Sequence, residues 1–290
     1  MDERFELKYD KRKWGEVIPT PVNTLQLFIT NKCNLRCAGC FYQHKLGNGE
    51  MSFEEYKTHV LQHRKEIDKV ILLGGEPTLH QNLPEIIDFN NEQGLRTTLY
   101  TNGVRLDALD RTDLSSTQVR IGVYGSFSSE KPLYKISPPD FPVTIVYMLR
   151  RDNIAEFEQT ASMAEHRFNC DGFYISSIRD ITSTQDFWKD TPDTIPLKQY
   201  YEIVQQFVDG YEGTIPVLHI ARRGVIETEL TAKNDLVSRC RFGNIFPDGE
   251  KIICPFDISR KITTNALSFG TRSCNKHKNC ILEKIVLRRK

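Results

Sequence analysis

Three cysteines lie within residues 31–42 of the 290-residue chain, at Cys33, Cys37 and Cys40. Their spacing is C-x3-C-x2-C, and an aromatic residue, Phe41, follows directly. Thiolates are protein ligands of both zinc and iron–sulfur clusters. Structural zinc takes four protein ligands, whereas three thiolates on one loop suit a [4Fe–4S] cluster with one iron open to another molecule. The loop therefore predicts a cluster that binds a second molecule and passes it an electron.

The composition is that of an ordinary soluble protein, with 39% hydrophobic residues, 27% charged residues and a net charge of +1. Such a balance does not indicate a nucleic-acid or membrane partner. No apolar run approaches the ~20 residues that span a bilayer, and the N-terminus lacks the apolar segment of a secretory signal. We expect a cytosolic protein, where structural disulfides are rare. Its eight cysteines then indicate metal binding.

The elements that must position this loop follow from the hydrophobic pattern of residues 24–220. Short β-prone runs predict strands at 24–30, 69–73, 96–100, 119–123, 143–149 and 172–176. Helices are expected after the capping box Ser52–Glu55, from Asn82, from Asn153 and from Leu197. Strands that alternate with helices predict a parallel sheet. Six strands are too few for a closed eight-stranded barrel, so the expected fold is α/β, a partial (βα)6 barrel, with 215–220 as a candidate further strand.

Several polar segments follow directly after these strands. The cysteine loop follows the first strand, Gly74-Gly75-Glu76-Pro77 the second, Thr101-Asn102-Gly103 the third and Arg150–Asn153 the fifth. In parallel α/β folds the chemistry gathers at the carboxyl ends of the strands. We therefore expect these segments to meet at one mouth of the barrel.

In their order and position, these motifs resemble those of the radical S-adenosylmethionine (radical SAM) enzymes, over roughly residues 24–220. In that family the amino and carboxylate groups of S-adenosylmethionine (SAM) chelate the open iron. One electron from the cluster cleaves the sulfonium, and the resulting 5′-deoxyadenosyl radical abstracts a hydrogen atom from the substrate. The resemblance implies a [4Fe–4S] cluster, SAM, and a reductant such as flavodoxin or ferredoxin.

The resemblance also implies contacts with SAM. The two glycines after the second strand allow the backbone to approach the methionyl group, and Glu76 is a candidate partner of its ammonium. Simpler alternatives are that Phe41 is a core aromatic, Asn102 a turn residue and Asn153 a helix cap. The candidate SAM-binding residues are Phe41, Gly74, Gly75, Glu76, Pro77, Asn102, Ser126, Arg150 and Asn153.

A second set of cysteines follows the barrel, at Cys240, Cys254, Cys274 and Cys280. The first two bracket Pro247-Asp248-Gly249, which predicts a hairpin with one cysteine on each arm. The pattern resembles the SPASM or twitch extensions of radical SAM enzymes and implies a second [4Fe–4S] cluster. Structural zinc is the alternative, since four thiolates can close a tetrahedral site. The predicted organisation is an N-terminal arm (1–23), the partial barrel (24–220) and a small cysteine-rich region (221–290).

The substrate is the least constrained part of this prediction. A small molecule or a peptide is expected, because the 23-residue arm is too short for a leader-peptide recognition domain. The basic stretch 276–290 keeps an RNA-modifying enzyme as an alternative. A non-catalytic iron–sulfur electron carrier with zinc at the C-terminus is a third possibility, but it leaves the Gly-Gly-Glu-Pro turn unexplained.

Overall fold

The structure is a computed structural model that describes residues 16–19, 23–37, 40, 42–126, 131–177, 195, 197–222, 242–252 and 281–287. The predictions for Phe41 and for the second cysteine set, Cys240, Cys254, Cys274 and Cys280, lie outside the described residues. So do most of the N-terminal arm and much of the basic stretch 276–290.

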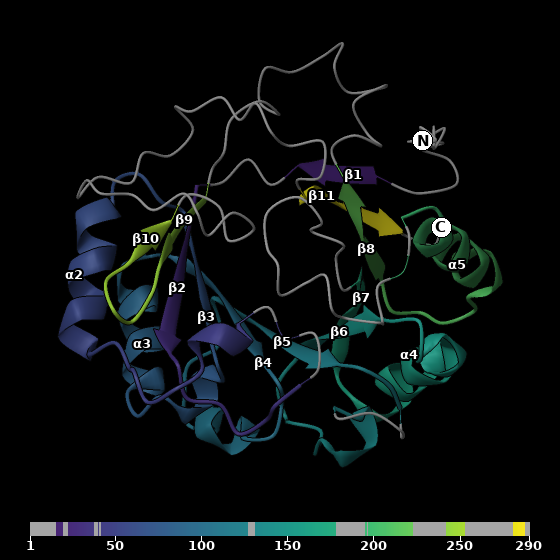
Figure 1. The fold of residues 1–290 in the computed structure, drawn as a ribbon, viewed down its shortest axis with the longest axis horizontal. Helices are drawn as coiled ribbons and strands as arrows, with labels where there is room; N and C mark the ends of the chain where they lie inside the picture. The colour runs from purple at the N-terminus through teal and green to yellow at the C-terminus, as the bar shows by residue number, and fades with distance from the viewer. Residues whose placement is uncertain are drawn as a thin grey trace, which may run out of the picture.

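Seven consecutive strands form the centre of one sheet, and each is parallel to its neighbours. They follow one another around an open arc (Figure 1), so the predicted α/β fold and partial barrel are confirmed. The seventh strand corresponds to the candidate strand that the sequence predicts at residues 215–220. The seven are β2 (Thr24–Thr30), β3 (Lys69–Gly74), β4 (Arg96–Thr101), β5 (Thr117–Val123), β6 (Val143–Leu149), β7 (Cys170–Ser177) and β8 (Val217–Arg222).

The long helices lie outside the arc, on the convex side of the sheet (Figure 1). They are α2 (Phe53–His63), α3 (Leu83–Glu92), α4 (Phe157–Arg167) and α5 (Leu197–Gly210). Among the residues that the structure describes, the connections from β4 to β5 and from β5 to β6 each contain a 3-10 turn and no α-helix. The 3-10 turns are η1 (Gln43–Lys45), η2 (Pro77–Leu79), η3 (Leu106–Leu109), η4 (Leu133–Lys135) and η5 (Ile154–Glu156).

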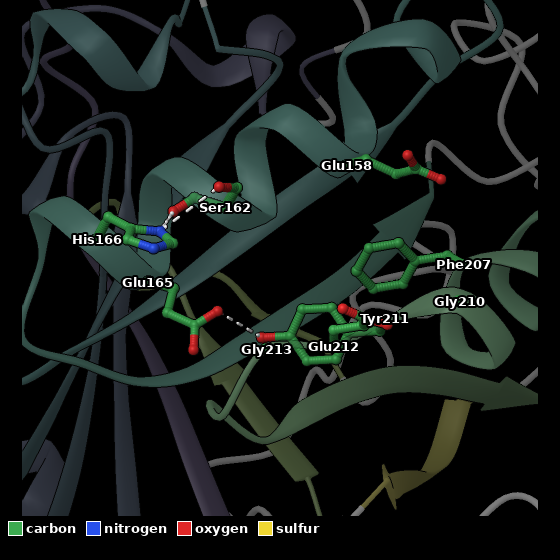
Figure 2. Close-up of a pocket in the computed structure, with 9 residues that line it drawn as sticks. All are labelled: Glu158, Ser162, Glu165, His166, Phe207, Gly210, Tyr211, Glu212 and Gly213. Carbon is green, nitrogen blue, oxygen red and sulfur yellow. Dashed lines mark hydrogen bonds between the residues drawn. The ribbon is translucent and has the colours of Figure 1, made fainter.

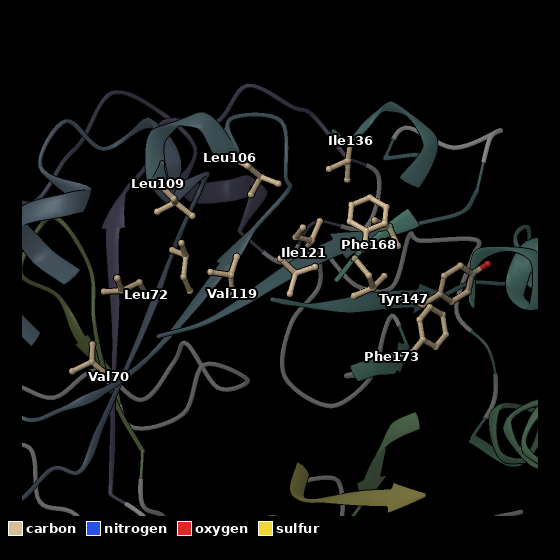
Figure 3. Packing of buried hydrophobic residues seen from close by; sticks show 14 of the residues in the cluster. Val70, Leu72, Leu106, Leu109, Val119, Ile121, Ile136, Tyr147, Phe168 and Phe173 are labelled. Atoms are coloured by element: carbon tan, nitrogen blue, oxygen red, sulfur yellow. The ribbon is translucent and has the colours of Figure 1, made fainter. Parts of the chain in front are cut away.

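The two faces of the sheet differ in polarity. On the convex face, apolar side chains such as Val70, Leu72, Val119 and Ile121 pack into the main core (Figure 3). Successive side chains of a strand point to opposite faces, so the intervening residues face the concave side. On β5 and β6 these include Gln118, Arg120 and Thr144. Fully covered parallel strands are usually apolar on both faces, so the polar concave face indicates a binding space.

Strands from both ends of the chain extend this sheet at its two edges. Beside β2 lies β9 (Phe242–Ile245), which is parallel to it and forms an antiparallel hairpin with β10 (Lys251–Ile252). This confirms the predicted hairpin, whose turn holds Gly249 at φ 77°. Beside β8 lies β11 (Ile281–Leu287), which pairs in turn with β1 (Glu16–Pro19). Both pairings are antiparallel.

Within the described ranges, none of the helices combines the length and the apolar character needed to cross a bilayer.

The capping box predicted at α2 is present. The Ser52 hydroxyl accepts a hydrogen bond from the Glu55 backbone N–H at 3.2 Å, and the Glu55 carboxylate accepts one from the Ser52 N–H at 2.8 Å. We expect Ser52→Ala to lower the free energy of unfolding by about 1 kcal/mol, because an N-terminal donor of the helix loses its partner. Urea unfolding measures this change. Ser162→Ala, inside α4, is the matched control and should be neutral, so equal losses in both variants would contradict the assignment.

Candidate active site at the mouth of the barrel

The cysteine loop leaves the carboxyl end of β2. Cys33, Cys37 and Cys40 are all partly buried and none forms a disulfide. The Leu35 backbone N–H lies 3.4 Å from the Cys33 sulfur. The Arg36 guanidinium donates to the carbonyls of Cys33 and Leu35, both at 2.9 Å. The first part of the loop is therefore held by its own residues.

An aromatic stack lies beside the third cysteine. The Phe28 ring stacks on Tyr42 and on Phe246, with centroids 5.0 Å and 4.5 Å apart, and Cys40 and Leu73 pack against this cluster. The Tyr42 hydroxyl donates to the Asn31 side-chain oxygen at 2.6 Å. Burial raises the pKa of the Cys40 thiol, and the positive charge of Lys131 opposes that rise. The stack shelters this side of the loop from water.

Phe246 belongs to the C-terminal hairpin, so the hairpin contacts the cysteine loop directly. Phe242 pairs with Thr24, which brings Phe246 and the hairpin turn to the carboxyl end of β2. The Lys45 ammonium, just after the loop, forms ion pairs with Asp248 at 3.0 Å and Glu250 at 2.7 Å. It also lies 4.7 Å from the centroid of the Phe246 ring. The sequence pattern predicts the hairpin, but its docking on the cysteine loop leaves no local signal in the sequence.

The Gly-Gly-Glu-Pro turn lies against the start of the cysteine loop. The N–H of Gly75 donates to the Thr30 carbonyl at 2.8 Å, and that of Glu76 to the Lys32 carbonyl at 2.7 Å. A Cβ on Gly74, whose φ is 147°, would lie 2.3 Å from the Thr30 oxygen, and one on Gly75 would lie 2.2 Å from the Lys32 oxygen. Glycine is required at both positions because two backbones touch there.

Glu76 joins this turn to the end of β4. Its side chain is buried, and one carboxylate oxygen accepts hydrogen bonds from the Thr78 N–H, the Thr78 hydroxyl and the Thr101 hydroxyl at 3.1, 2.7 and 2.6 Å. The other oxygen accepts from the Asn102 N–H at 2.7 Å. Pro77, also buried, begins η2 directly after it. In this structure the Glu76 carboxylate therefore binds the chain itself.

Asn102 carries the connection on to the cysteine loop. Its side-chain amide donates to the Asn34 side-chain oxygen at 2.7 Å, and its own oxygen accepts from the Val104 N–H at 3.0 Å. Asn34 lies between the first two cysteines. Three of the four segments predicted to meet at one barrel mouth are thus joined by one chain of hydrogen bonds.

The remaining candidates lie at the ends of β5 and β6. Ser126 is buried, its N–H donates to the Glu156 carboxylate at 2.7 Å, and its hydroxyl lies 3.0 Å from the Glu156 and Gln159 oxygens. The Asn153 side chain accepts from the Arg150 N–H at 2.7 Å. It also donates to the carbonyls of Tyr124 and Met148, at 2.6 and 2.9 Å.

Asn153 occupies the N-cap position of η5 but makes no capping hydrogen bond with its side chain. It joins two strand ends instead. The Arg150 guanidinium is buried, contacts both carboxylate oxygens of Asp152 at 3.0 and 2.8 Å, and lies 5.2 Å from the centroid of the Tyr124 ring. The side chains of Ser126, Arg150 and Asn153 therefore all have partners within the chain, and a contact with SAM remains a proposal.

A cavity of about 400 Å³ lies elsewhere, between α4 and the end of α5 (Figure 2). Both helices are outside the barrel, and none of the predicted site residues lines this cavity. Its lining residues are Glu158, Ser162, Glu165, His166, Phe207, Gly210, Tyr211, Glu212 and Gly213.

The cysteine loop fits a [4Fe–4S] cluster in its donor chemistry. It offers three thiols that form no disulfide, next to a glycine turn and an aromatic cluster. In the part of the chain that the structure describes, no three His, Cys, Asp or Glu side chains converge closely enough to hold one metal ion. Residues 38 and 39, between the second and third thiols, are not described.

The residues that build this site are similar to those of known proteins. Residues 27–125 match the Radical SAM superfamily. Over these residues, which build the mouth of the barrel, the chain is similar to radical SAM enzymes. The matched range contains the cysteine loop, the Gly-Gly-Glu-Pro turn and the Thr-Asn-Gly turn, so the resemblance seen in the sequence is confirmed. The family implies a [4Fe–4S] cluster and SAM at this mouth.

Several individual proteins are similar to the chain. The Fe-coproporphyrin III synthase of Methanosarcina barkeri is 38% identical over 82 residues, which are 27% of this chain and 21% of that protein. The antilisterial bacteriocin subtilosin biosynthesis protein AlbA of Bacillus subtilis is 21% identical over 240 residues, covering 76% of this chain and 53% of AlbA. The chain thus spans about a fifth and about half of these two relatives.

Among solved structures, Streptococcus suis SuiB bound to its precursor peptide SuiA has a similar fold. Its TM-score is 0.63 at 13% sequence identity, and the match covers 87% of this chain and 63% of SuiB.

We expect Glu76→Gln to lower the free energy of unfolding by about 2–3 kcal/mol. In glutamine an NH₂ group, which is a hydrogen-bond donor, replaces one of the two oxygens. That NH₂ would face the backbone N–H of Thr78 or of Asn102, and a backbone N–H can only donate. Urea unfolding measures the loss. Glu92→Gln, the same change at an exposed position, is the control. A Glu76→Gln variant as stable as the control would show that the carboxylate does not hold the mouth together.

Proposed function

We propose that the protein is a radical SAM enzyme that cleaves SAM reductively and abstracts a hydrogen atom from a small molecule or a peptide. The observation that carries this proposal is the chain of hydrogen bonds from Glu76 through Asn102 to Asn34. It fixes the cysteine loop against the Gly-Gly-Glu-Pro turn, where the family binds its cluster and SAM.

In this proposal Cys33, Cys37 and Cys40 hold the [4Fe–4S] cluster. When bound, the cluster supplies the single electron that cleaves SAM and starts hydrogen abstraction. The chain's own residues orient and shelter the site. Tyr42 and its aromatic neighbours exclude water from the side of Cys40. Backbone groups of the turn lie beside the loop for contact with the methionyl group. The residues proposed to contact SAM remain Phe41, Gly74, Gly75, Glu76, Pro77, Asn102, Ser126, Arg150 and Asn153.

We further propose that Cys240, Cys254, Cys274 and Cys280 hold a second [4Fe–4S] cluster that assists oxidation or anchors the substrate, with structural zinc as the alternative. Support comes from the hairpin that separates the first two of these cysteines, because its turn docks on the first cysteine loop. A flavodoxin or ferredoxin is the proposed electron donor.

A peptide is included among the substrates because of two similar proteins. AlbA is named for bacteriocin biosynthesis, and SuiB was solved with a precursor peptide bound. Their similarity supports this substrate class alongside a small molecule.

The activity is tested by 5′-deoxyadenosine release from SAM, with dithionite as reductant and anaerobically reconstituted protein. We expect Cys37→Ala to lower release to background because the cluster loses a thiolate. Cys170→Ala is the control and should retain release, since this partly buried thiol lies on β7 outside the motif and donates to the Gly172 carbonyl at 3.2 Å. Wild-type protein that releases no 5′-deoxyadenosine, even with cell extract as a source of substrate, would refute the proposal.

The second cluster is tested separately by metal analysis. Two [4Fe–4S] clusters give about eight irons per chain, and Cys254→Ala should lower this to about four. About four irons and one zinc in the wild-type protein would instead establish the zinc alternative.

A further inference from the structure

Arg120 is a buried cation on the concave face of the barrel, in the middle of β5. Only 4% of the residue is exposed. Its Nε and Nη2 donate to the Gln118 side-chain oxygen at 2.9 and 2.6 Å, and its Nη1 donates to the Tyr100 hydroxyl at 2.7 Å. All of these partners are neutral. Burial of a charge is costly unless an opposite charge or a full set of hydrogen bonds offsets it.

The Arg120 guanidinium has N–H donors that none of these hydrogen bonds uses. It has five N–H groups, and the three hydrogen bonds leave one N–H on each Nη atom. Across the described residues, no carboxylate forms an ion pair with Arg120. The nearest acid in its network is Asp171, reached only through Gln118 and then Thr144, at 3.0 and 2.6 Å. Two donors on different nitrogens can bind a carboxylate or a phosphate in a bidentate manner.

The surroundings of Arg120 are suited to a ligand. Its guanidinium carbon lies 5.4 Å from the centroid of the Tyr100 ring and 5.6 Å from that of Tyr174, so two aromatic faces hold it in place. On the same face of β4, the Thr98 hydroxyl is buried and has no hydrogen-bond partner within the described part of the chain. That hydroxyl is a further polar group available to a bound molecule.

Two more cations face the same space. Gly122 follows Arg120 on the concave face, and a Cβ there would lie 3.1 Å from the Lys131 ammonium. The two positions are about 7 Å apart along the strand. Lys69, on β3, has its pKa lowered to about 8, first by burial and then by repulsion from Arg120 and Arg96. The concave face therefore carries a positive field beneath the cysteine loop.

We propose that this face binds an oxyanion of the substrate, a carboxylate or a phosphate, with Arg120 as its bidentate ligand and Lys131 as a second cation. The identity of the bound molecule as substrate rests on the proposed function. SAM also carries a carboxylate. However, Arg120 lies three residues before the last residue of β5, about 10 Å below the strand ends where the motifs gather.

The test measures anion binding to anaerobically reconstituted protein without SAM. Inorganic phosphate is followed by the width of its ³¹P NMR signal, and ¹³C-labelled acetate by the width of its ¹³C signal. We expect Arg120→Gln to raise the dissociation constant of the preferred anion at least tenfold, the effect of losing a charge-assisted pair. Arg111→Gln removes the same charge from an exposed position and should change it less than twofold. Tighter binding of phosphate assigns a phosphorylated substrate, and tighter binding of acetate a carboxylate.

Additional variants separate binding from folding. Arg120→Lys should recover part of the affinity for the anion. In folded Arg120→Gln, the pKa of Lys69 should rise above about 8, because the positive charge that repels it is gone. If Arg120→Gln does not fold, Lys131→Gln, at a partly exposed position, carries the same expectation.

The proposal is overturned if neither anion binds at millimolar concentration, or if folded Arg120→Gln binds as the wild type does. It is also overturned if SAM affinity falls along with anion affinity, which would assign Arg120 to SAM. Because the titration contains no SAM, a failure of SAM cleavage leaves its result standing.

Discussion

The Glu76 carboxylate is buried between the ends of β3 and β4, where four donors surround it. A buried carboxylate is tolerated only when its oxygens are satisfied, so the two strand ends are held in one relative position. Asn102 extends that constraint to Asn34 in the cysteine loop. The geometry of the mouth depends on this one carboxylate, because each of its donors lies at the end of a strand or directly after one.

The two faces of the sheet differ because the helices cover only the convex one. Helices cover the convex face and supply the apolar core, which leaves the concave face free to be polar. There the aromatic stack at Phe28 shelters the cysteine loop, while Arg120 and its neighbouring cations lie deeper. Alternate residues of the same strands therefore have different roles. Those on the convex face pack the core, and those on the concave face line the candidate site.

The sequence was sufficient to predict the elements and which segments follow them, because hydrophobic periodicity and the Ser52 capping box are local signals. It did not reveal the docking of Phe246 on Phe28, since a contact between residues so far apart leaves no local pattern. The close contacts of the turn's glycines with Thr30 and Lys32 were not predicted for the same reason. Arg120 was overlooked inside a predicted strand. Its spacing of two from Gln118 was the available signal of a polar inner face.

The placement of β9 beside β2 also bears on how the protein is made. Ribosomes add about 5–20 residues per second, so Phe246 emerges on the order of 10–40 s after Tyr42. During that interval the edge of β2 is uncovered and the aromatic wall beside Cys40 is incomplete. The Cys40 side of the loop therefore gains its full aromatic packing only after most of the chain has been translated.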